Sequence, residues 1–420
     1  MLPEGWSRAC VRDVVDESRR VTYGIVQPGP RQERGVPIIR GKDYSSGRVD
    51  DTDLYLVSPE VASKYGRSTV RGGDILMSIV GYLGLVAVVP EHLSGANITQ
   101  TTARVAIAPP NIPEFFFQQF QSRAFQGQVR RYQKGSAQPG LNLADVDKME
   151  VIVPPVPEQQ RIAAMLQAVD DAIEAGEAVA DQLDRLRRDL AEELVTRGLP
   201  LRRHRMKRTV IGTLPESWGL AALSDVGQVQ TGLAKGKVPA GATLELPYLR
   251  VANVQDGHVD LEEMKTVAVE PEALERYRLR SGDVLFTEGG DFDKLGRGCV
   301  WRGQIDPCLH QNHVFAVRTN GELLPDFLAA HAASRRGRAY FLDCAKRTTN
   351  LASINSTQLK AMPVPLPPLD EQRAIVDAVG TVIDRIAKAR ADVAERRRVK
   401  AALADALLTG KIRVPEAQTM

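Results

Sequence analysis

The amino-acid sequence predicts an α+β fold, in which two α/β domains related by a pseudo-two-fold axis are joined by two long helices that form an antiparallel coiled coil. Three observations predict this architecture. Nearly the whole sequence is repeated once in the same order. Each copy begins with short apolar runs separated by turns, and each copy ends in a long helical segment with one apolar stripe.

The repeat is visible in four short motifs. The first copy contains LPEGW at 2–6, RGGDILMS at 71–78, PPVPEQQRI at 154–162 and LVTRG at 194–198. They return as LPESW at 214–218, RSGDVLFT at 280–287, PPLDEQRAI at 367–375 and LLTGK at 407–411. Because order and spacing are kept, the sequence indicates duplication of a unit of roughly 210 residues, far longer than a solenoid repeat.

The first part of each copy has the pattern of a compact α+β domain. Apolar runs such as VPIIR, DILMSIV, TARVAIA and MEVIVP alternate with Gly and Pro turns, and PEFFFQQFQSRAF has helical character. The RGGD and RSGD motifs are predicted to be tight turns, with Gly73 and Gly282 in backbone geometry that favours glycine.

The second part of each copy is predicted to be one long helix. Apolar residues separated by three or four positions form the seam of a coiled coil. The predicted seam comprises Ile162, Leu166, Val169, Ile173, Leu183, Leu186, Leu190 and Leu194 in the first helix, and Ile375, Val379, Val382, Ile386, Val393, Val399, Leu403 and Leu407 in the second. It is interrupted by Gly176 and by Arg396, which corresponds to Leu183. An alternative is that each helix packs on its own domain.

The helix starts are marked by paired prolines, which cannot continue a helix. Pro157 suits the first helical position, and Asp370 is predicted to cap the second helix. Glu158 and Glu371 fall in the first turn, where the helix dipole favours a carboxylate. The predicted boundaries are therefore domain 1 at 1–155, a helix at 156–198, domain 2 at 199–368 with a basic linker at 199–213, a helix at 369–413, and a tail at 414–420.

Composition indicates a soluble globular protein of at least two domains, with 420 residues, 43% of them apolar. Cys10, Cys299, Cys308 and Cys344 show no CxxC spacing, as expected in a reducing compartment. The N-terminus lacks the apolar core of a signal peptide, and the uncharged run at 75–90 is too short to cross a bilayer and is interpreted as two buried strands around GYLG. A cytoplasmic location is expected.

The net charge of +3 does not by itself indicate nucleic-acid binding. Two local runs are basic, however. Residues 197–208 carry six Arg or Lys and no acid, and residues 123–134 carry four and no acid. Such runs are either solvated surface or phosphate-binding patches.

No catalytic or metal site is predicted. The sequence has no (D/N)PP(Y/F) tetrapeptide of an adenine methyltransferase and no GxxxxGK(S/T) phosphate loop. Cys308, His310 and His313 resemble a metal cluster, but Ile98, Gln100 and Ala103 stand near those places in the first copy, so a metal is not expected.

The repeated LPExW, the two PPxxEQxxI helix starts, YLRVANVQDGHVD from Tyr248 and LTGKIRV from Leu408 together resemble the specificity subunit of a type I restriction-modification enzyme, over the whole chain. The resemblance implies a non-catalytic subunit whose two target recognition domains read the halves of a split double-stranded DNA target, with the helices setting the distance between them. It implies two methyltransferase subunits that methylate adenine at N6 and restriction subunits as partners. S-adenosylmethionine, ATP and Mg²⁺ would be bound by those partners and not by this chain. The alternative is a duplicated coiled-coil adaptor without DNA readout.

Comparison of the two copies selects candidate DNA contacts, because shared positions suit phosphates and differing positions suit bases. Arg40 and Arg250 are either phosphate contacts or framework ion pairs. Lys42-Asp43 differs from Ala252-Asn253, Gln100 is matched with Gln311, and the loop from Lys134 is matched with that from Arg347. The full set is Arg40, Lys42, Gln100, Arg130, Arg131, Lys134, Gln138, Asn142, Arg250, Asn253, Gln311, Asn312, His313, Lys346, Arg347, Asn350 and Asn355. Gln159 and Gln372 serve either the helix-start junction, which is favoured, or docking of the methyltransferase.

Overall fold

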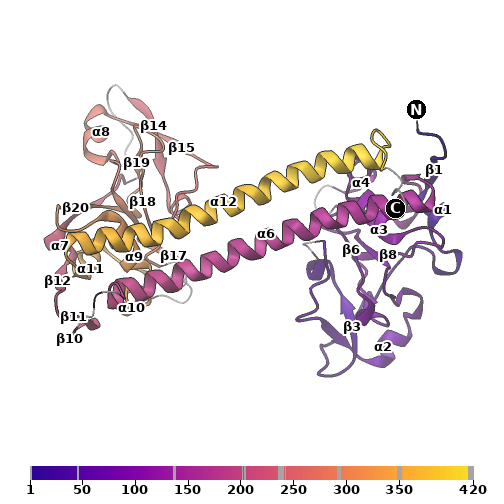
Figure 1. Cartoon of the computed structure of the whole chain (residues 1–420), viewed down its shortest axis with the longest axis horizontal. Helices are drawn as coiled ribbons and strands as arrows, with labels where there is room; N and C mark the ends of the chain where they lie inside the picture. The colour runs from indigo at the N-terminus through magenta and orange to yellow at the C-terminus, as the bar shows by residue number, and fades with distance from the viewer. Residues whose placement is uncertain are drawn as a thin grey trace, which may run out of the picture. The chain divides into compact units, whose positions relative to one another are not determined.

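The chain folds into two compact units in a computed structural model that describes residues 2–44, 47–135, 139–200, 202, 205–234, 241, 243–290, 295–347 and 352–414. Unit 1 consists of Met1–Glu177 and Ala391–Met420, and unit 2 consists of Ala178–Arg390. Both boundaries lie inside the two long helices, α6 (Val156–Arg197) and α12 (Leu369–Leu408), so each unit contains part of both helices (Figure 1).

Unit 1 contains three small sheets. The first has the antiparallel order β2 (Thr22–Tyr23), β8 (Thr102–Val105), β5 (Ile75–Ser78) and β6 (Val86–Val88). The second has the order β4 (Tyr55–Val57), β3 (Val36–Ile39) and β7 (Asn97–Ile98), with β3 and β7 parallel. The third pairs β1 (Ser7–Cys10) with β9 (Glu150–Val153). The helices of this domain are α1 (Val11–Val14), α2 (Pro59–Ser63), α3 (Pro113–Gln121), α4 (Arg123–Tyr132) and α5 (Leu143–Asp147).

Unit 2 repeats these three sheets strand for strand and has further small sheets besides them. The three repeated sheets have the orders β13 (Gly227–Thr231), β20 (Val314–Thr319), β16 (Val284–Thr287), β18 (Gly298–Val300); β15 (Lys265–Val269), β14 (Leu244–Leu249), β19 (Leu309–His310); and β12 (Gly219–Ala222), β23 (Pro363–Leu366). The helices are α7 (Leu223–Val226), α8 (Pro271–Tyr277), α9 (Pro325–Ala333), α10 (Arg335–Cys344) and α11 (Ser356–Lys360). A hairpin of β10 (Met206–Thr209) and β11 (Gly212–Pro215) precedes them. The predicted duplication is therefore confirmed in the fold.

Each domain core also contains residues of both long helices. In unit 1, Phe116 and Phe120 of α3 pack in one cluster with Leu166 of α6 and Leu407 of α12. In unit 2, the corresponding cluster holds Trp218 and Phe327 together with Leu194 of α6 and Ile375 of α12. The sequence allowed the helices to pack on each other or each on its own domain. The structure shows both kinds of packing for each helix.

The helices pair in antiparallel fashion within each unit. In unit 1, Asp170 of α6 binds Lys400 of α12 (2.6 Å), whereas Glu177, farther along α6, binds Arg397, earlier in α12. In unit 2, the last turns of α6 and the first turns of α12 share one apolar cluster. The predicted antiparallel coiled coil is confirmed in both units.

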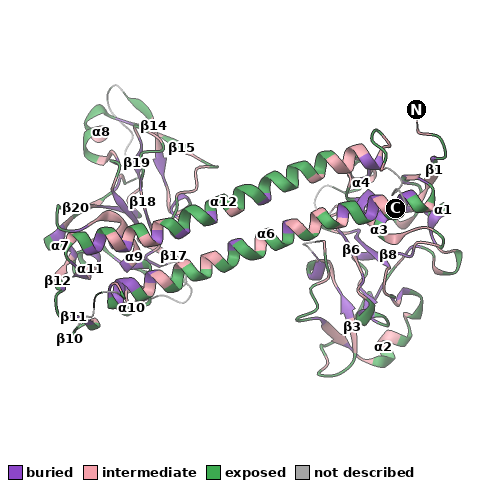
Figure 2. Ribbon diagram, in the orientation of Figure 1, coloured by how far each residue is buried: buried purple, intermediate pink, exposed green. Residues whose placement is uncertain are grey.

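Most of the predicted seam is buried, but two positions are wrong. In Figure 2, buried and half-buried residues recur among exposed ones along both long helices. Leu186 and Val399, which correspond to one another in the repeat, are each 52% exposed. In α6, Ala180 and Ala191 are buried instead. In α12, Lys400 binds Asp170 of α6, whereas the neighbouring Val399 is exposed. Leu183, Leu190, Val169 and Leu403 are half-buried, and the other predicted seam residues are buried.

The two interruptions of the seam meet each other. A Cβ atom on Gly176 would lie 2.8 Å from Cγ2 of Val393, so the glycine makes room for that side chain. Arg396 then donates from Nη1 to the carbonyl oxygen of Ala172 (2.6 Å). Gly176 and Arg396 therefore lie at the same close contact between the two helices.

The predicted helix starts are confirmed within one residue, but the predicted cap is wrong. Helix α12 begins at Leu369, so Asp370 lies inside the first turn, where its carboxylate binds Arg202 (2.5 Å). Pro157 is the second residue of α6. No helix in the described parts of the chain is both long enough and apolar enough to cross a membrane.

Candidate nucleic-acid interface

Three segments of domain 1 meet at one end of its four-stranded sheet, beyond the C-terminal end of β5. The turn after β5 pairs with the late loop through Val80 and Gly140, and Gly140 pairs in turn with Lys134. The segment before β8 joins them, because Ile79 donates from its backbone N–H to the carbonyl of Thr101 (2.9 Å). We refer to residues 79–84, 99–101, 134–135 and 139–140 as the loop edge of unit 1.

Unit 2 builds the same loop edge from residues 288–290, 311–313, 346–347 and 352–353. Here β22 (Ala352–Ser353) lies between β17 (Gly289–Gly290) and β21 (Lys346–Arg347). Glu288 donates from its backbone N–H to the carbonyl of His313 (2.9 Å), as Ile79 does to Thr101. The candidate loops and the residues before the inner strands are thus brought together twice.

The backbone pairings in the two loop edges correct two of the predicted matches between residues of the two copies. Lys134 faces Gly140, and Lys346 faces Ser353, so Lys346 and not Arg347 is the counterpart of Lys134. Gln100 donates from its backbone N–H to Ile25, and Asn312 does so to Leu233, which makes Asn312 and not Gln311 the counterpart of Gln100. The errors arose because loop lengths differ by a residue between the copies.

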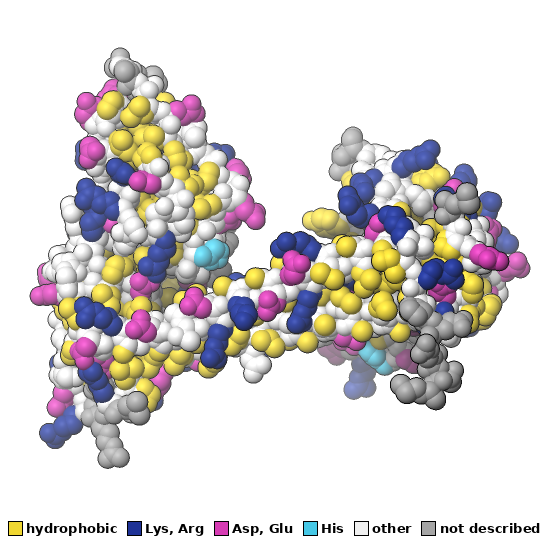
Figure 3. Space-filling model, turned by 45° about the horizontal axis from the view of Figure 1, so that its top comes forward, with side chains coloured by type: hydrophobic (Ala, Val, Ile, Leu, Met, Phe, Trp, Pro, Cys, Tyr) yellow, Lys and Arg dark blue, Asp and Glu magenta, His cyan; other side chains and the backbone are white. Residues whose placement is uncertain are grey.

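The basic candidate residues differ in whether their charged groups form ion pairs with described residues. Arg130 and Arg131, in the last turn of α4, are exposed, and neither forms an ion pair with any described residue. Lys134 is exposed but its ammonium group binds Asp145 (2.6 Å). Lys346 is exposed on β21 beside Arg347. Basic and acidic side chains alternate over the face shown in Figure 3, in keeping with the small net charge.

The two candidate asparagines at the far end of the loops have different local roles. Asn355 accepts the N–H of Gln358 at its side-chain oxygen (2.9 Å) and so caps α11. Asn142 precedes α5 at the equivalent place, but its side chain is exposed and makes no cap bond. Gln138 and Asn350 lie outside the described residues.

Arg40 and Arg250 have framework partners. Arg40 makes two bonds to Asp43, from Nε and from Nη2 (both 2.9 Å), and Arg250 donates from Nη2 to the carbonyl of Glu263 (2.8 Å). Asn253, the counterpart of Asp43, is 2% exposed, and its amide donates to the carbonyl of Asp260 (2.9 Å). The structure therefore favours framework roles for these residues over base readout, while the neighbouring Lys42 is exposed.

The residues around His313 are polar and already have hydrogen-bond partners within the protein. His313 is exposed and binds Glu288, whereas His310 is buried with Nδ1 bound to the carbonyl of Val314 (2.7 Å). Burial lowers the pKa of His310 and raises the pKa of the Cys308 thiol to about 12. Within the described ranges, no group of three His, Cys, Asp or Glu side chains is placed to hold a metal ion.

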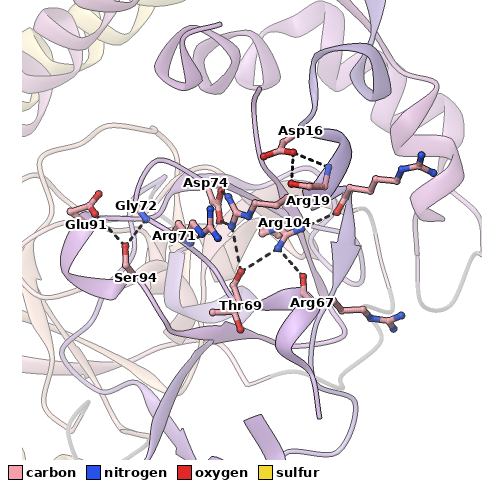
Figure 4. Close-up of polar contacts among 12 residues, drawn as sticks. Asp16, Arg19, Arg67, Thr69, Arg71, Gly72, Asp74, Glu91, Ser94 and Arg104 are labelled. Atoms are coloured by element: carbon pink, nitrogen blue, oxygen red, sulfur yellow. Dashed lines mark hydrogen bonds and ion pairs between the residues drawn. The ribbon is translucent and has the colours of Figure 1, made fainter. Parts of the chain in front are cut away.

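The opposite end of the sheet is occupied by the RGGD turn, which is a framework element (Figure 4). Gly73 has φ +82° and Gly282 has φ +97°, which confirms the predicted backbone geometry. Asp74 binds Arg19 through both carboxylate oxygens (2.5 and 2.7 Å), and it also accepts the N–H of Arg71 (2.8 Å). The buried Arg104 beside it donates to backbone carbonyl groups.

The helix-start junction explains why LPExW and PPxxEQ occur together. Trp6 donates from Nε1 to Glu158 (2.9 Å), and Arg413 donates to the same carboxylate from Nη2 (2.7 Å). Burial raises the pKa of Glu158, but the bonds from Arg413 and Trp6 lower it by more, so that the pKa lies below its ordinary value of 4.5. In unit 2, Trp218 donates to Glu371 in the same way (3.2 Å).

The two repeated glutamines complete these junctions. Gln159 is fully buried, accepts the N–H of Ile112 (3.0 Å) and donates to the carbonyl of Pro154 (2.9 Å). Gln372 makes the equivalent bonds to Leu324 and Pro367. Both amide groups are therefore used inside the domain, in bonds that favour the predicted role in the junction.

The sequence interpretation missed Tyr82. This side chain is 85% exposed at the tip of the turn in the loop edge of unit 1. Residues 75–90 were interpreted as two buried strands, which is correct for β5 and largely so for β6. An aromatic residue placed between two glycines in GYLG was the signal available in the sequence.

The duplicated fold, with its paired loop edges and helix-start junctions, defines a class of two-domain proteins built from one repeated recognition module. The family model described as "Type I restriction modification DNA specificity domain" matches residues 3–184 and again residues 215–396. The chain therefore belongs to this family and contains its domain twice.

Curated relatives agree with the assignment. The chain is 24% identical to the type I restriction enzyme EcoKI specificity subunit of Escherichia coli strain K12 over 393 residues, which cover 90% of this chain and 82% of that protein. It is 33% identical to the Escherichia coli EcoBI specificity subunit over 178 residues, covering 41% and 37%. A chain in a solved structure titled for complex assembly and conformational transition of the type I R-M system shares the fold, with a TM-score of 0.59, 19% identity and coverage of 98% and 100%.

Proposed function

We propose that this chain is the DNA specificity subunit of a type I restriction-modification system and binds a split double-stranded target, one half through each domain. One observation carries the proposal. The same loop edge is built twice on one repeated scaffold, while the residues placed at it differ between the copies.

The differences lie where base readout would be expected. Gln100 and Thr101 in unit 1 correspond to Asn312 and His313 in unit 2, and Gly140 corresponds to Ser353. Amide and imidazole groups form hydrogen bonds with base edges, whereas a basic residue shared by both copies suits the invariant phosphates. Lys134 and Lys346 are shared in this way. Two domains with one scaffold and different edge residues would read two different half-targets.

We further propose that the chain has no catalytic site of its own and directs two adenine-N6 methyltransferase subunits and the restriction subunits to the target. The missing methyltransferase tetrapeptide and phosphate loop support this division. S-adenosylmethionine, ATP and Mg²⁺ would then be bound by the partner subunits, in the cytoplasm. Leu186 and Val399 support two copies of one partner, because they are exposed apolar residues at corresponding positions of the repeat.

Sequencing of methylated adenine in host DNA, with and without the gene for this chain, tests the proposal. We expect one split motif whose methylation is lost when the gene is deleted and restored when the gene is supplied again. An unchanged methylation pattern would contradict it.

Binding of the chain together with its methyltransferase subunits to genomic fragments, measured at several salt concentrations, gives an independent test. Specific binding should persist at salt concentrations that remove non-specific binding. Complete loss of binding at those concentrations would favour the adaptor without DNA readout.

A further inference from the structure

Tyr82 stands at the end of a turn that is rigidly held in the loop edge of unit 1. The turn needs glycine on both sides, since Gly81 has φ +81° and Gly84 has φ +76°. Gly84 accepts a bond from Nε2 of Gln126 on α4 (2.8 Å), and a Cβ atom at Gly84 would lie 2.6 Å from the Oε1 atom of that side chain. Leu83 packs against the domain core. The base of the turn is thus fixed against α4, and Tyr82 alone projects.

The tip of the turn lies next to the late loop, which follows the basic end of α4. Gly81 donates from its backbone N–H to the carbonyl of Pro139 (3.0 Å), so the tip of the turn lies next to the loop that begins at Lys134. That loop follows the last turn of α4, where Arg130 and Arg131 are exposed and form no ion pair with a described residue. The exposed ring and the two exposed guanidinium groups are therefore carried by the turn and by α4, which contact each other through Gly84 and Gln126.

Nucleic acid satisfies both features at once. Guanidinium groups bind the phosphate backbone, and an apolar or aromatic side chain that projects beyond them reaches the bases, where such residues insert between base steps or stack on them. A protein partner would supply a pocket for the ring, but the exposed guanidinium groups of Arg130 and Arg131 suit an anionic surface. Duplex DNA supplies both the anionic backbone and the apolar faces of the bases.

We infer that Tyr82 is a specificity-determining residue of domain 1, whose ring contacts the bases of one half-target while Arg130 and Arg131 hold the neighbouring phosphates. This inference rests on the proposed function and goes further by naming the residue that enters the DNA. The ring, and not the hydroxyl group, makes the contact. The half-target read by domain 2 does not depend on it.

Selection of duplexes from a pool with a randomised central segment tests the inference, with the full chain bound to its methyltransferase subunits. The wild-type complex should enrich a split sequence. The Tyr82→Ala complex should lose preference in one half only and bind the wild-type sequence roughly 10- to 100-fold more weakly, as expected for one lost base contact. Its salt dependence should be unchanged, because no phosphate contact is lost. Tyr82→Phe should behave as wild type.

Two further variants separate the contributions. Val210→Ala removes a side chain that is 88% exposed in the turn between β10 and β11 and should change neither affinity nor sequence preference. Arg130→Ala with Arg131→Ala should weaken binding to all sequences alike and reduce the slope of log affinity against log salt by about 2.

The outcomes distinguish failure of the inference about Tyr82 from failure of the proposed function. If the wild-type complex enriches a split sequence and Tyr82→Ala enriches the same sequence with the same affinity, the inference is wrong and the proposed function stands. If Tyr82→Phe weakens binding as much as Tyr82→Ala does, the ring contact is wrong. A wild-type complex that enriches no sequence would overturn the proposed function and the inference together.

Discussion

Glu158 shows at the scale of a single residue why the chain repeats its motifs in pairs. Its carboxylate is 2% exposed and receives hydrogen bonds from Trp6, near the start of domain 1, and from Arg413, after the end of α12. One side chain therefore connects the first turn of α6 with two segments that are remote in sequence. Glu371 and Trp218 repeat the arrangement in unit 2.

Glu158→Gln tests this junction. The amide places an N–H group where the indole and guanidinium groups donate, so we expect the free energy of unfolding of unit 1 to fall by about 2 kcal/mol, as for a lost charged hydrogen bond. Calorimetry at neutral pH would measure the loss. Glu150→Gln is the matched control, because the ion pair of Glu150 with Arg8 is exposed on both sides and should contribute less than about 0.5 kcal/mol.

The effect of Glu158→Gln should also depend on pH. Because the pKa of Glu158 is lowered in the folded chain, its stabilising contribution is complete above the ordinary value of 4.5 and is lost as the pH falls below that value. The difference between variant and wild type should therefore shrink in acid. An equal difference at pH 7 and well below pH 4 would contradict the assigned role of the charge.

His331 predicts a second pH dependence, confined to unit 2. Burial lowers its pKa from 6.5 to about 4, opposed by the hydrogen bond to the carbonyl of Pro363 and assisted by Arg336. Between these values the unfolded chain binds a proton that the folded chain does not, so stability falls as the pH falls from 6.5 towards 4.

His331→Gln should reduce this dependence, since the amide can still donate to Pro363 but does not titrate. The rest should remain, because burial also lowers the pKa of His310 in unit 2. Thermal unfolding of both proteins between pH 4 and pH 7 measures the slopes, with the exposed His258→Gln as control. Identical slopes for wild type and His331→Gln would show that His331 is not the titrating group.

At the scale of secondary-structure elements, the long helices were the most predictable part of the chain. Paired prolines fix where each helix starts, and an apolar stripe over many turns fixes its continuity. The stripe alone could not settle which side chains face inward. The buried positions include the small residues Ala180 and Ala191, and Lys400 forms an ion pair with Asp170, whereas Leu186 and Val399 are exposed. Which side chains face inward therefore depends on the partner helix.

The loop edges were only partly predictable for a similar reason. Lys134 and its loop could be chosen from charge and composition. The ladder that joins this loop to the turn after β5 links residues more than 50 positions apart, and local sequence carries little information on such pairing. Tyr82 was missed because its exposure becomes apparent only when Gly84 is seen against α4.

The crossing at Gly176 is an element-scale feature that mutation can test. Gly176→Leu should destabilise unit 1 by about 1–3 kcal/mol, because the added side chain overlaps Val393. Adding Val393→Ala should restore part of the loss. Gly380→Ala in α12 is the matched control: nothing lies within 4 Å of its added Cβ, so helix propensity should stabilise the protein by up to about 1 kcal/mol. Chemical unfolding would measure all four proteins, and no loss for Gly176→Leu would contradict the close crossing.

At the scale of the whole molecule, the repeat predicts that two copies of one partner bind equivalent surfaces. Leu186→Glu and Val399→Glu each place a charge on one exposed apolar position. We expect each single variant to bind one methyltransferase subunit instead of two, and the double variant to bind none. Native mass spectrometry of the assembled complex counts the subunits. Full assembly of the double variant would show that the partner binds elsewhere.

We propose that the two long helices set the gap between the half-targets that the two domains read. The most direct test inserts seven helix-forming residues after Glu177 in α6 and seven after Arg390 in α12, at the two boundaries between the units. Seven residues keep the seam in phase and lengthen each helix by about 10 Å, or about three base pairs of DNA. Sequencing of methylated adenine should then show both half-targets unchanged and a gap about three base pairs longer. Altered half-targets with an unchanged gap would contradict the claim.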